Sequence, residues 1–149
     1  MRLGFVAEVA FTSKLMRTPE ITKAAQISSD KIKAARVLLN QLEPKLCSTA
    51  QEHIKVQGAK VPKYEWYDLG MDLLFGLDNI IEYRGKVYGI DVTTNPDSVW
   101  RKHRRMQSRI TVYQELGLDG VAVVQPNEEF DPIEMAEKLY HSEYYATIV

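Results

Sequence analysis

Two aspartates, Asp78 and Asp91, flank a segment whose pattern is typical of a β-hairpin. Apolar runs stand on either side of Arg84-Gly85, and a dipeptide ending in glycine suits a two-residue turn because glycine readily adopts a positive φ. Counting outward from this turn places Asp78 opposite Asp91, and residues paired in this way share a face with Cβ atoms roughly 5 Å apart. The sequence therefore predicts that the two carboxylates converge.

Two like charges held so close destabilise a sheet unless a partner neutralises them. A divalent cation would do this, and Mg²⁺ is commonly held by one or two carboxylates with water and substrate phosphate; Mn²⁺ is the alternative ion. Asp91 lies within the apolar, β-branched run VYGIDVTT, where a carboxylate is costly unless it is paired or bound to metal. Thr93 lies on the same face, and Gly89 is expected to leave room there.

A simpler interpretation gives this pair no chemistry. Asp78 then only starts the hairpin, Asp91 only ends it, and each carboxylate is solvated at the rim of the sheet. Asp72 is a second candidate for the first acid if the hairpin is longer than the turn suggests. Spacing alone leaves these alternatives open.

The elements that must position these residues form an α/β pattern. After the hairpin, Asn95-Pro96 ends the strand, and a helix is expected over residues 98–116. The apolar run Gly120–Val124 predicts a strand buried on both faces, and a last helix is expected over Pro132–Tyr140. Because a helix between two strands usually makes a parallel crossover, the predicted core is a mixed β-sheet flanked by helices in the order αβββαβ.

The first half of the chain has a helical pattern, with apolar residues such as Ala35 and Leu39 at helical spacing. From about residue 54 the runs become shorter, β-branched and aromatic, so one or two strands are expected before the hairpin. We expect a single domain over residues 1–149, with a helical N-terminal part of about 1–53 and a sheet core of about 54–149.

The composition is that of an ordinary globular domain, with 45% hydrophobic and 26% charged residues. No stretch approaches the ~20 consecutive apolar residues of a membrane span, and no clear leader pattern opens the chain, so we expect a cytoplasmic protein without membrane contact. Cys47 is the single cysteine, which rules out an intrachain disulfide. The net charge of −1 gives no overall footprint for nucleic acid, but the run Arg101–Arg105 is densely basic.

The hairpin segment resembles that of PD-(D/E)XK nucleases, the restriction-endonuclease-like superfamily, in which an aspartate opens one strand and an acidic-x-Lys triplet lies on the next. On this resemblance Asp78 matches the first acid and Asp91 the second, and the carbonyl of Val92 is a third metal ligand. The early segment GFVAE resembles the family's first helix, which makes Glu8 a supporting contact or a ligand of a second metal. The resemblance implies a restriction-endonuclease-like core with a helical N-terminal extension.

One position departs from the family pattern, because Thr93 occupies the place of the triplet's lysine. Some members of the superfamily supply this lysine from the following helix, and Lys102 is placed for that role. It would orient or help to deprotonate the attacking water. Arg101, Arg105 and Gln107 are candidates for contacts with substrate, as is Thr93.

These residues predict a metal-dependent nuclease, an endonuclease or exonuclease that hydrolyses phosphodiester bonds, with DNA favoured over RNA as substrate. A homodimer is favoured because cutting two strands commonly needs two sites. The alternative is a catalytically inactive module of the same fold that binds nucleic acid or protein, an alternative that Thr93 and the long helical N-terminal part favour.

Overall fold

A computed structural model describes residues 3–127 and 129–149, with side chains from residue 9 onward. Its elements follow in the order α1 (Leu3–Met16), β1 (Thr22–Lys23), α2 (Ser29–Leu42), α3 (Pro44–Gly58), the 3₁₀ turn η1 (Lys63–Glu65), α4 (Trp66–Phe75), β2 (Asn79–Tyr83), β3 (Lys86–Val92), α5 (Pro96–Ser108), α6 (Ile110–Glu115), β4 (Gly120–Val124), α7 (Pro132–His141) and β5 (Ala146–Ile148). None of the helices in the described part combines the length and apolar character that a membrane span requires.

The strands form one mixed sheet in the order β1-β2-β3-β4-β5. Neighbours are antiparallel from β1 to β3 and parallel from β3 to β5. The hairpin has the predicted register, with Tyr83 opposite Lys86 and Ile80 opposite Gly89. Arg84 and Gly85 both have positive φ, 50° and 76°, as a type I′ turn requires.

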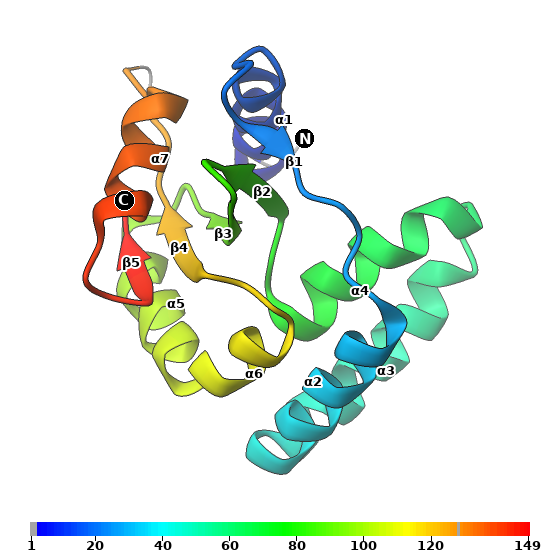
Figure 1. Cartoon of the computed structure of the whole chain (residues 1–149). Helices are drawn as coiled ribbons and strands as arrows, with labels where there is room; N and C mark the ends of the chain where they lie inside the picture. Colours follow the sequence, from blue (N-terminus) through cyan, green and yellow to red (C-terminus); the bar gives the residue numbers. More distant parts are fainter. Residues whose placement is uncertain (1–2, 128) are drawn as a thin grey trace.

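Helices cover both faces of the sheet, as Figure 1 shows. Helices α1 and α7 pack on one face, and α5 and α6 on the other, where α2 to α4 extend the apolar core. Helices α5 and α6 form the crossover between the parallel strands β3 and β4, as predicted. The mixed sheet flanked by helices is thus confirmed, but helices α2 to α4 separate β1 from β2 in the chain.

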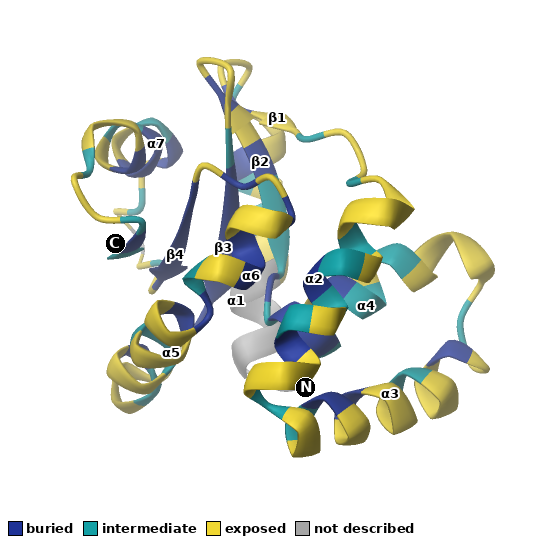
Figure 2. Ribbon diagram, turned by 60° about the horizontal axis from the view of Figure 1, so that its bottom comes forward, coloured by how far each residue is buried: buried dark blue, intermediate teal, exposed yellow. Residues whose placement is uncertain are grey.

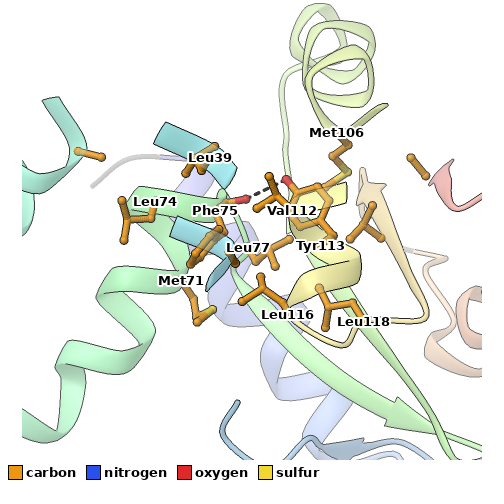
Figure 3. Packing of buried hydrophobic residues seen from close by; sticks show 14 of the residues in the cluster. Leu39, Met71, Leu74, Phe75, Leu77, Met106, Val112, Tyr113, Leu116 and Leu118 are labelled. Atoms are coloured by element: carbon orange, nitrogen blue, oxygen red, sulfur yellow. Dashed lines mark hydrogen bonds between the residues drawn. The ribbon is translucent and has the colours of Figure 1, made fainter. Parts of the chain in front are cut away.

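Buried side chains of the α5–α6 side tie this face together (Figure 3). Leu77 and Leu118 pack where β2 and β4 begin, and Phe75 and Tyr113 join α4 to α6. The Tyr113 hydroxyl donates a hydrogen bond of 2.9 Å to the carbonyl of Phe75. Figure 2 shows the buried strands between largely exposed outer helix surfaces.

The prediction of strands between residue 54 and the hairpin is wrong. Helix α3 continues to Gly58, and residues 63–75 form η1 and α4. Gly76 ends α4 in the left-handed conformation, φ 69°, a common glycine cap of helices. Short apolar and aromatic runs fit a strand or a buried helix equally well, and here packing against α3 favours helix.

The third strand of the core comes instead from Thr22–Lys23, inside the part expected to be helical. This strand has two residues, too few for a period-two pattern to be visible in the sequence. Its pairing with β2 makes α2, α3 and α4 an insertion between two neighbouring strands, and Figure 1 shows this insertion projecting to one side of the sheet.

The helix expected over 98–116 is divided into α5 and α6 at Arg109. The backbone of Arg109 leaves helical geometry, φ −113° and ψ 16°, and its side chain is buried. The guanidinium forms an ion pair with Glu43, between α2 and α3. The break therefore directs a charged side chain into the core, where it meets the helical insertion.

Replacing Gly89 with alanine is expected to lower the free energy of unfolding by about 1–3 kcal/mol. A Cβ atom there would lie 2.9 Å from Leu77 Cδ1 and 3.1 Å from Leu118 Cδ1, and both leucines are buried. The room expected beside Gly89 is thus filled by these side chains, contrary to the prediction from sequence.

Urea-induced unfolding measures this effect, with Gly70→Ala as the matched control. Nothing lies within 4 Å of a Cβ at Gly70, and this position is inside helix α4, so alanine should raise stability by up to about 1 kcal/mol. Equal stability of Gly89→Ala and the unchanged chain would contradict the close packing at this position.

Candidate functional site

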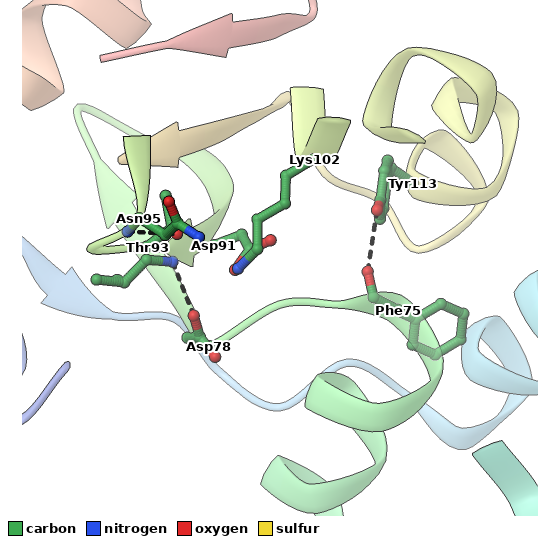
Figure 4. A network of polar contacts seen from close by, with 8 residues as sticks. Phe75, Asp78, Asp91, Thr93, Asn95, Lys102 and Tyr113 are labelled. Atoms are coloured by element: carbon green, nitrogen blue, oxygen red, sulfur yellow. Dashed lines mark hydrogen bonds and ion pairs between the residues drawn. The ribbon is translucent and has the colours of Figure 1, made fainter. Parts of the chain in front are cut away.

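Asp78 and Asp91 flank the last observed pair of the hairpin, Asn79 opposite Ile90, so the predicted register would place them opposite one another if it continued. Asp78 immediately precedes β2, and its N–H donates a 2.8 Å hydrogen bond to the carbonyl of Ile90. Asp91 lies in β3 and is 7% exposed. Strand alternation directs it to the face covered by α5, as Figure 4 shows.

Lys102 reaches this pair from the second turn of α5. Its Nζ lies 3.0 Å from Asp91 Oδ1, and the side chains are 21% and 10% exposed. A largely buried carboxylate is stable only with such a partner. The structure therefore brings together the two groups that the sequence associated, while a catalytic role of Lys102 stays a prediction.

The backbone of β3 holds the other aspartate. The N–H of Val92 donates a 2.7 Å hydrogen bond to Asp78 Oδ2, a charge-assisted contact that fixes the carboxylate. The contact that Val92 makes with Asp78 thus uses its N–H group, whereas the resemblance assigned its carbonyl to a metal.

Thr93 is buried and organises the turn from β3 into α5. Its Oγ1 accepts a 3.3 Å hydrogen bond from the N–H of Asn95, and its own N–H donates to the carbonyl of Val124 in β4 at 2.9 Å. Asn95 then caps α5 by accepting from the N–H of Asp97 at 3.0 Å. These contacts give Thr93 a structural function at the position where the family has its lysine.

Asp72 joins this group from α4, the helix of the insertion nearest the hairpin. Partial burial of its carboxyl raises the pKa of Asp72, and the negative charge of Asp91 raises it further. A hydrogen bond with Asp78 and the charge of Lys102 act in the opposite direction. Asp72 keeps an exposed surface, but the burial of its carboxyl group and the like charge of Asp91 act together and raise its pKa.

Asp72 and Asp78 were alternatives for the first acid in the sequence, and the structure places both beside Asp91. The site thus carries three carboxyl groups against one ammonium group. Among the described residues no group of three His, Cys, Asp or Glu side chains is arranged to hold a metal ion. The arrangement can therefore offer a cation at most a pair of carboxylates, with water completing the coordination.

Replacing Asp72 with asparagine is expected to raise the melting temperature at neutral pH, because it removes a carboxylate whose ionisation opposes folding. The pKa of Asp72 lies above its ordinary value of 3.8 in the folded chain. The unfolded chain therefore ionises first, and stability falls as pH rises from 3.8 through the raised pKa.

Melting curves from acid to neutral pH test this expectation, with Glu52→Gln, at an exposed position on α3, as the control. Asp72→Asn should flatten the pH profile in that window, whereas Glu52→Gln should leave it unchanged. A lower melting temperature of Asp72→Asn at neutral pH would show that the carboxylate stabilises the fold.

The remaining candidates from the sequence are not gathered at the carboxylates. Arg101, Arg105 and Gln107 are exposed on α5, while Lys102 on the same helix turns inward to Asp91. The side chain of Glu8 lies outside the described residues. Contacts of the three exposed residues with substrate therefore stay predictions.

A cleft of about 340 Å³ beside Asp78 was not foreseen. It lies between α1, β1, α4 and β2, and its walls are mostly apolar. Its lining includes Leu15, Ile21, Tyr67, Met71, Asp78 and Asn79. No local pattern could have predicted it, because its walls come from segments that are far apart in the sequence.

Compared with models of known protein families, with curated proteins and with solved structures, the chain matches none. The interpretation of the site therefore depends on its geometry and its chemistry.

Proposed function

We propose that the chain is a metal-dependent nuclease that hydrolyses phosphodiester bonds at a site formed by Asp78, Asp91 and Lys102. The observation that carries this proposal is the 3.0 Å contact of Lys102 with Asp91, next to the Val92 N–H that holds the Asp78 carboxylate. Two carboxylates could hold one hard cation, and a nearby ammonium group could orient a water for hydrolysis.

The donor set suits Mg²⁺, with Mn²⁺ as the alternative. Carboxylate oxygens are the ligands that these ions prefer, and Mg²⁺ retains several waters when one or two carboxylates bind it. Asp78 and Asp91 would hold the ion, with the Val92 carbonyl as the ligand that the family resemblance adds. When bound, the ion would lower the pKa of a water and stabilise the charge that develops on the phosphoryl oxygens.

The chain's own residues would then position the reactants. Lys102, held by Asp91, would orient the attacking water, and the Val92 N–H keeps the Asp78 carboxylate in place. The N-terminal turn of α5 follows directly after β3, and its dipole favours a phosphate nearby. Glu8 would add a supporting contact or a second metal ligand.

The element order supports this assignment. Counted without the insertion α2–α4, the order αβββαβ is the one that the resemblance to PD-(D/E)XK nucleases implies, and the pair of acids lies on the expected hairpin. The restriction-endonuclease-like core, DNA as the favoured substrate, and a homodimer acting on two strands are parts of this proposal.

Incubation of the full chain with single-stranded DNA, duplex DNA and RNA tests the proposal directly. Cleavage is expected with Mg²⁺ or Mn²⁺ and should stop when EDTA is added. The ion alone should also raise the melting temperature, because it neutralises the two carboxylates and binds only the folded state. The proposal would be refuted if none of the substrates were cleaved and the ion left the melting temperature unchanged.

One observation favours a second candidate, a catalytically inactive module that binds nucleic acid. The ammonium group of Lys102 neutralises the charge of Asp91, while Thr93 acts in the turn at the position of the family's lysine. Such a module would bind oligonucleotides but leave them intact under the same conditions, which distinguishes it from a nuclease.

A further inference from the structure

Trp100 is an exposed indole on the second turn of α5, the helix that carries Lys102. Its side chain is 68% exposed, and the outer surface of α5 is largely exposed along its length (Figure 2). Because its ring is exposed, Trp100 does not contribute to the packing of the core. It is, however, a suitable platform for a flat apolar ligand.

Three exposed arginines follow this ring on the same helix. Arg101 follows Trp100 directly, Arg104 lies one turn further on the same side, and Arg105 lies one turn after Arg101. Like charges at a spacing of three or four residues destabilise a helix by a few tenths of a kcal/mol.

No carboxylate compensates this repulsion within the described residues. The ion pairs of that part of the chain involve none of the three arginines, although Asp97 stands one turn before Arg101. The chain has a net charge of −1, so this positive surface is local and does not reflect the overall composition. An unpaired basic surface of this kind is complementary to a polyanion.

A neighbouring ring supports Trp100 from the side of the sheet. The ring centroids of Trp100 and His103 are 6.4 Å apart with planes at 86°, and His103 Nε2 lies 3.0 Å from the carbonyl of Ala146 in β5. This contact ties the partner ring to the sheet, so the indole is held on one side while most of its surface stays accessible.

We propose that this face of α5 binds single-stranded nucleic acid, with a base stacked on Trp100 and the flanking phosphates on Arg101 and Arg104. The inference rests on the proposed function for its ligand class, since Trp100 and Lys102 belong to the same helix but point to opposite sides of it. A duplex hides the faces of its bases within the stack, whereas a single strand exposes them to an aromatic ring. The substrate class is therefore single-stranded nucleic acid.

The fluorescence of Trp100 can report the stacking directly. The chain has two tryptophans, and the Trp66→Phe variant leaves Trp100 as the only one. A short oligothymidylate, added with EDTA present to prevent cleavage, should quench this fluorescence and saturate. Because Trp66 Nε1 donates a hydrogen bond to the carbonyl of Gly58, Trp66→Phe is first compared with the unchanged chain in melting temperature.

Binding of a labelled oligothymidylate, followed by fluorescence anisotropy, tests the same point in the otherwise unchanged chain. Trp100→Ala should weaken binding roughly 5- to 100-fold, whereas Trp100→Phe should retain most of the affinity because it keeps an aromatic ring. Duplex DNA of equal length should bind more weakly than the single strand.

The arginines are tested through the salt dependence of binding. For single strands the slope of log K against log salt changes by about 0.7 for each phosphate contact that is lost. Arg101→Ala with Arg104→Ala should therefore reduce the slope by about 1.4, whereas the control Lys33→Ala with Lys45→Ala, at exposed positions of α2 and α3, should leave it unchanged.

Unchanged affinity of Trp100→Ala, absence of quenching in Trp66→Phe, or tighter binding of the duplex would each overturn the inference. None of these results depends on cleavage, since EDTA is present. Cleavage of a single strand without an effect of Trp100→Ala would leave the nuclease standing and remove the stacking site. Quenching without cleavage under Mg²⁺ would leave the stacking site standing and favour the inactive module.

Discussion

Replacement of Asp91 by asparagine is expected to reduce metal-dependent cleavage roughly 10³-fold or more. Asparagine keeps the shape of the side chain but removes the charge that would hold the cation and that now pairs with Lys102 at 3.0 Å. Both contributions depend on the carboxylate, so the loss should fall on kcat. Initial rates on single-stranded and duplex DNA at saturating Mg²⁺ measure it.

Asp97→Asn is the matched control, because Asp97 is an exposed carboxylate on α5 six residues further along the chain. It should retain activity close to that of the unchanged chain. Asp91→Asn also leaves Lys102 without its partner, so its melting temperature is measured alongside. A folded Asp91→Asn variant with full activity would remove Asp91 from the site.

A substitution of Lys102 distinguishes between the two proposed functions, an active nuclease and an inactive module. Lys102→Met keeps the aliphatic stem but loses the ammonium group, so cleavage should fall together with that of Asp91→Asn if Lys102 orients the water. The effects should not add when both residues are changed, because the two groups act as one unit. Full activity of Lys102→Met would show that the lysine only neutralises Asp91.

Replacement of Glu43 by alanine is expected to lower the free energy of unfolding by about 3–5 kcal/mol, a large share of the roughly 5–15 kcal/mol typical of a domain. Glu43 accepts the ion pair from Arg109, whose side chain is 3% exposed. Burial lowers the pKa of Arg109, but the hydrogen bond and charge of Glu43, together with the effects of Tyr113, act against burial, and the pKa is raised overall. Without Glu43 a permanently charged guanidinium would stay buried and unpaired.

Urea unfolding of the variant measures this loss, with Glu134→Ala as the control. Glu134 forms an exposed ion pair with Lys138 on α7, and such surface pairs contribute about 0–1 kcal/mol. The double change Glu43→Leu with Arg109→Met should recover much of the stability, because it removes the buried charge of Arg109 together with its half-buried partner. If the Glu43→Ala variant were as stable as Glu134→Ala, the ion pair of Glu43 with Arg109 would not stabilise the packing of the helical insertion against α6.

Arg109 also has an Nη2 atom that is buried without a hydrogen-bond partner among the described residues. Such an atom costs free energy in the folded state. The double apolar replacement removes this cost as well, which is a second reason to expect that it restores stability.

Local patterns in the sequence determined the hairpin and the elements that follow it. The register of β2 and β3 depends on the turn at Arg84-Gly85 and on period-two alternation, which are interactions between near neighbours. Strand β4 and helix α7 follow in the same way from a continuous apolar run and a helical period. The proximity of Asp78 and Asp91 belongs to this group, because both lie next to the predicted pair of Asn79 with Ile90.

The contact of Lys102 with Asp91 depends both on local sequence spacing and on tertiary structure. Helical spacing placed Lys102 at the edge of the inward stripe of α5, but only the crossover over the sheet brings that edge to Asp91. The early strand β1 could not be foreseen in this way, since its two residues carry no periodic signal and pair only because β2 presents an open edge.

Tertiary structure alone decided what surrounds the two aspartates. Asp72 reaches them because α4 ends at Gly76 and turns back toward the hairpin, and the space beside Gly89 is filled by side chains from two distant segments. Sequence spacing fixes relations along one element, where the backbone geometry is regular. Relations between elements depend on how their apolar faces pack, so the chemistry of Asp78, Asp91 and Lys102 could be proposed from the sequence, while the packing around them could not.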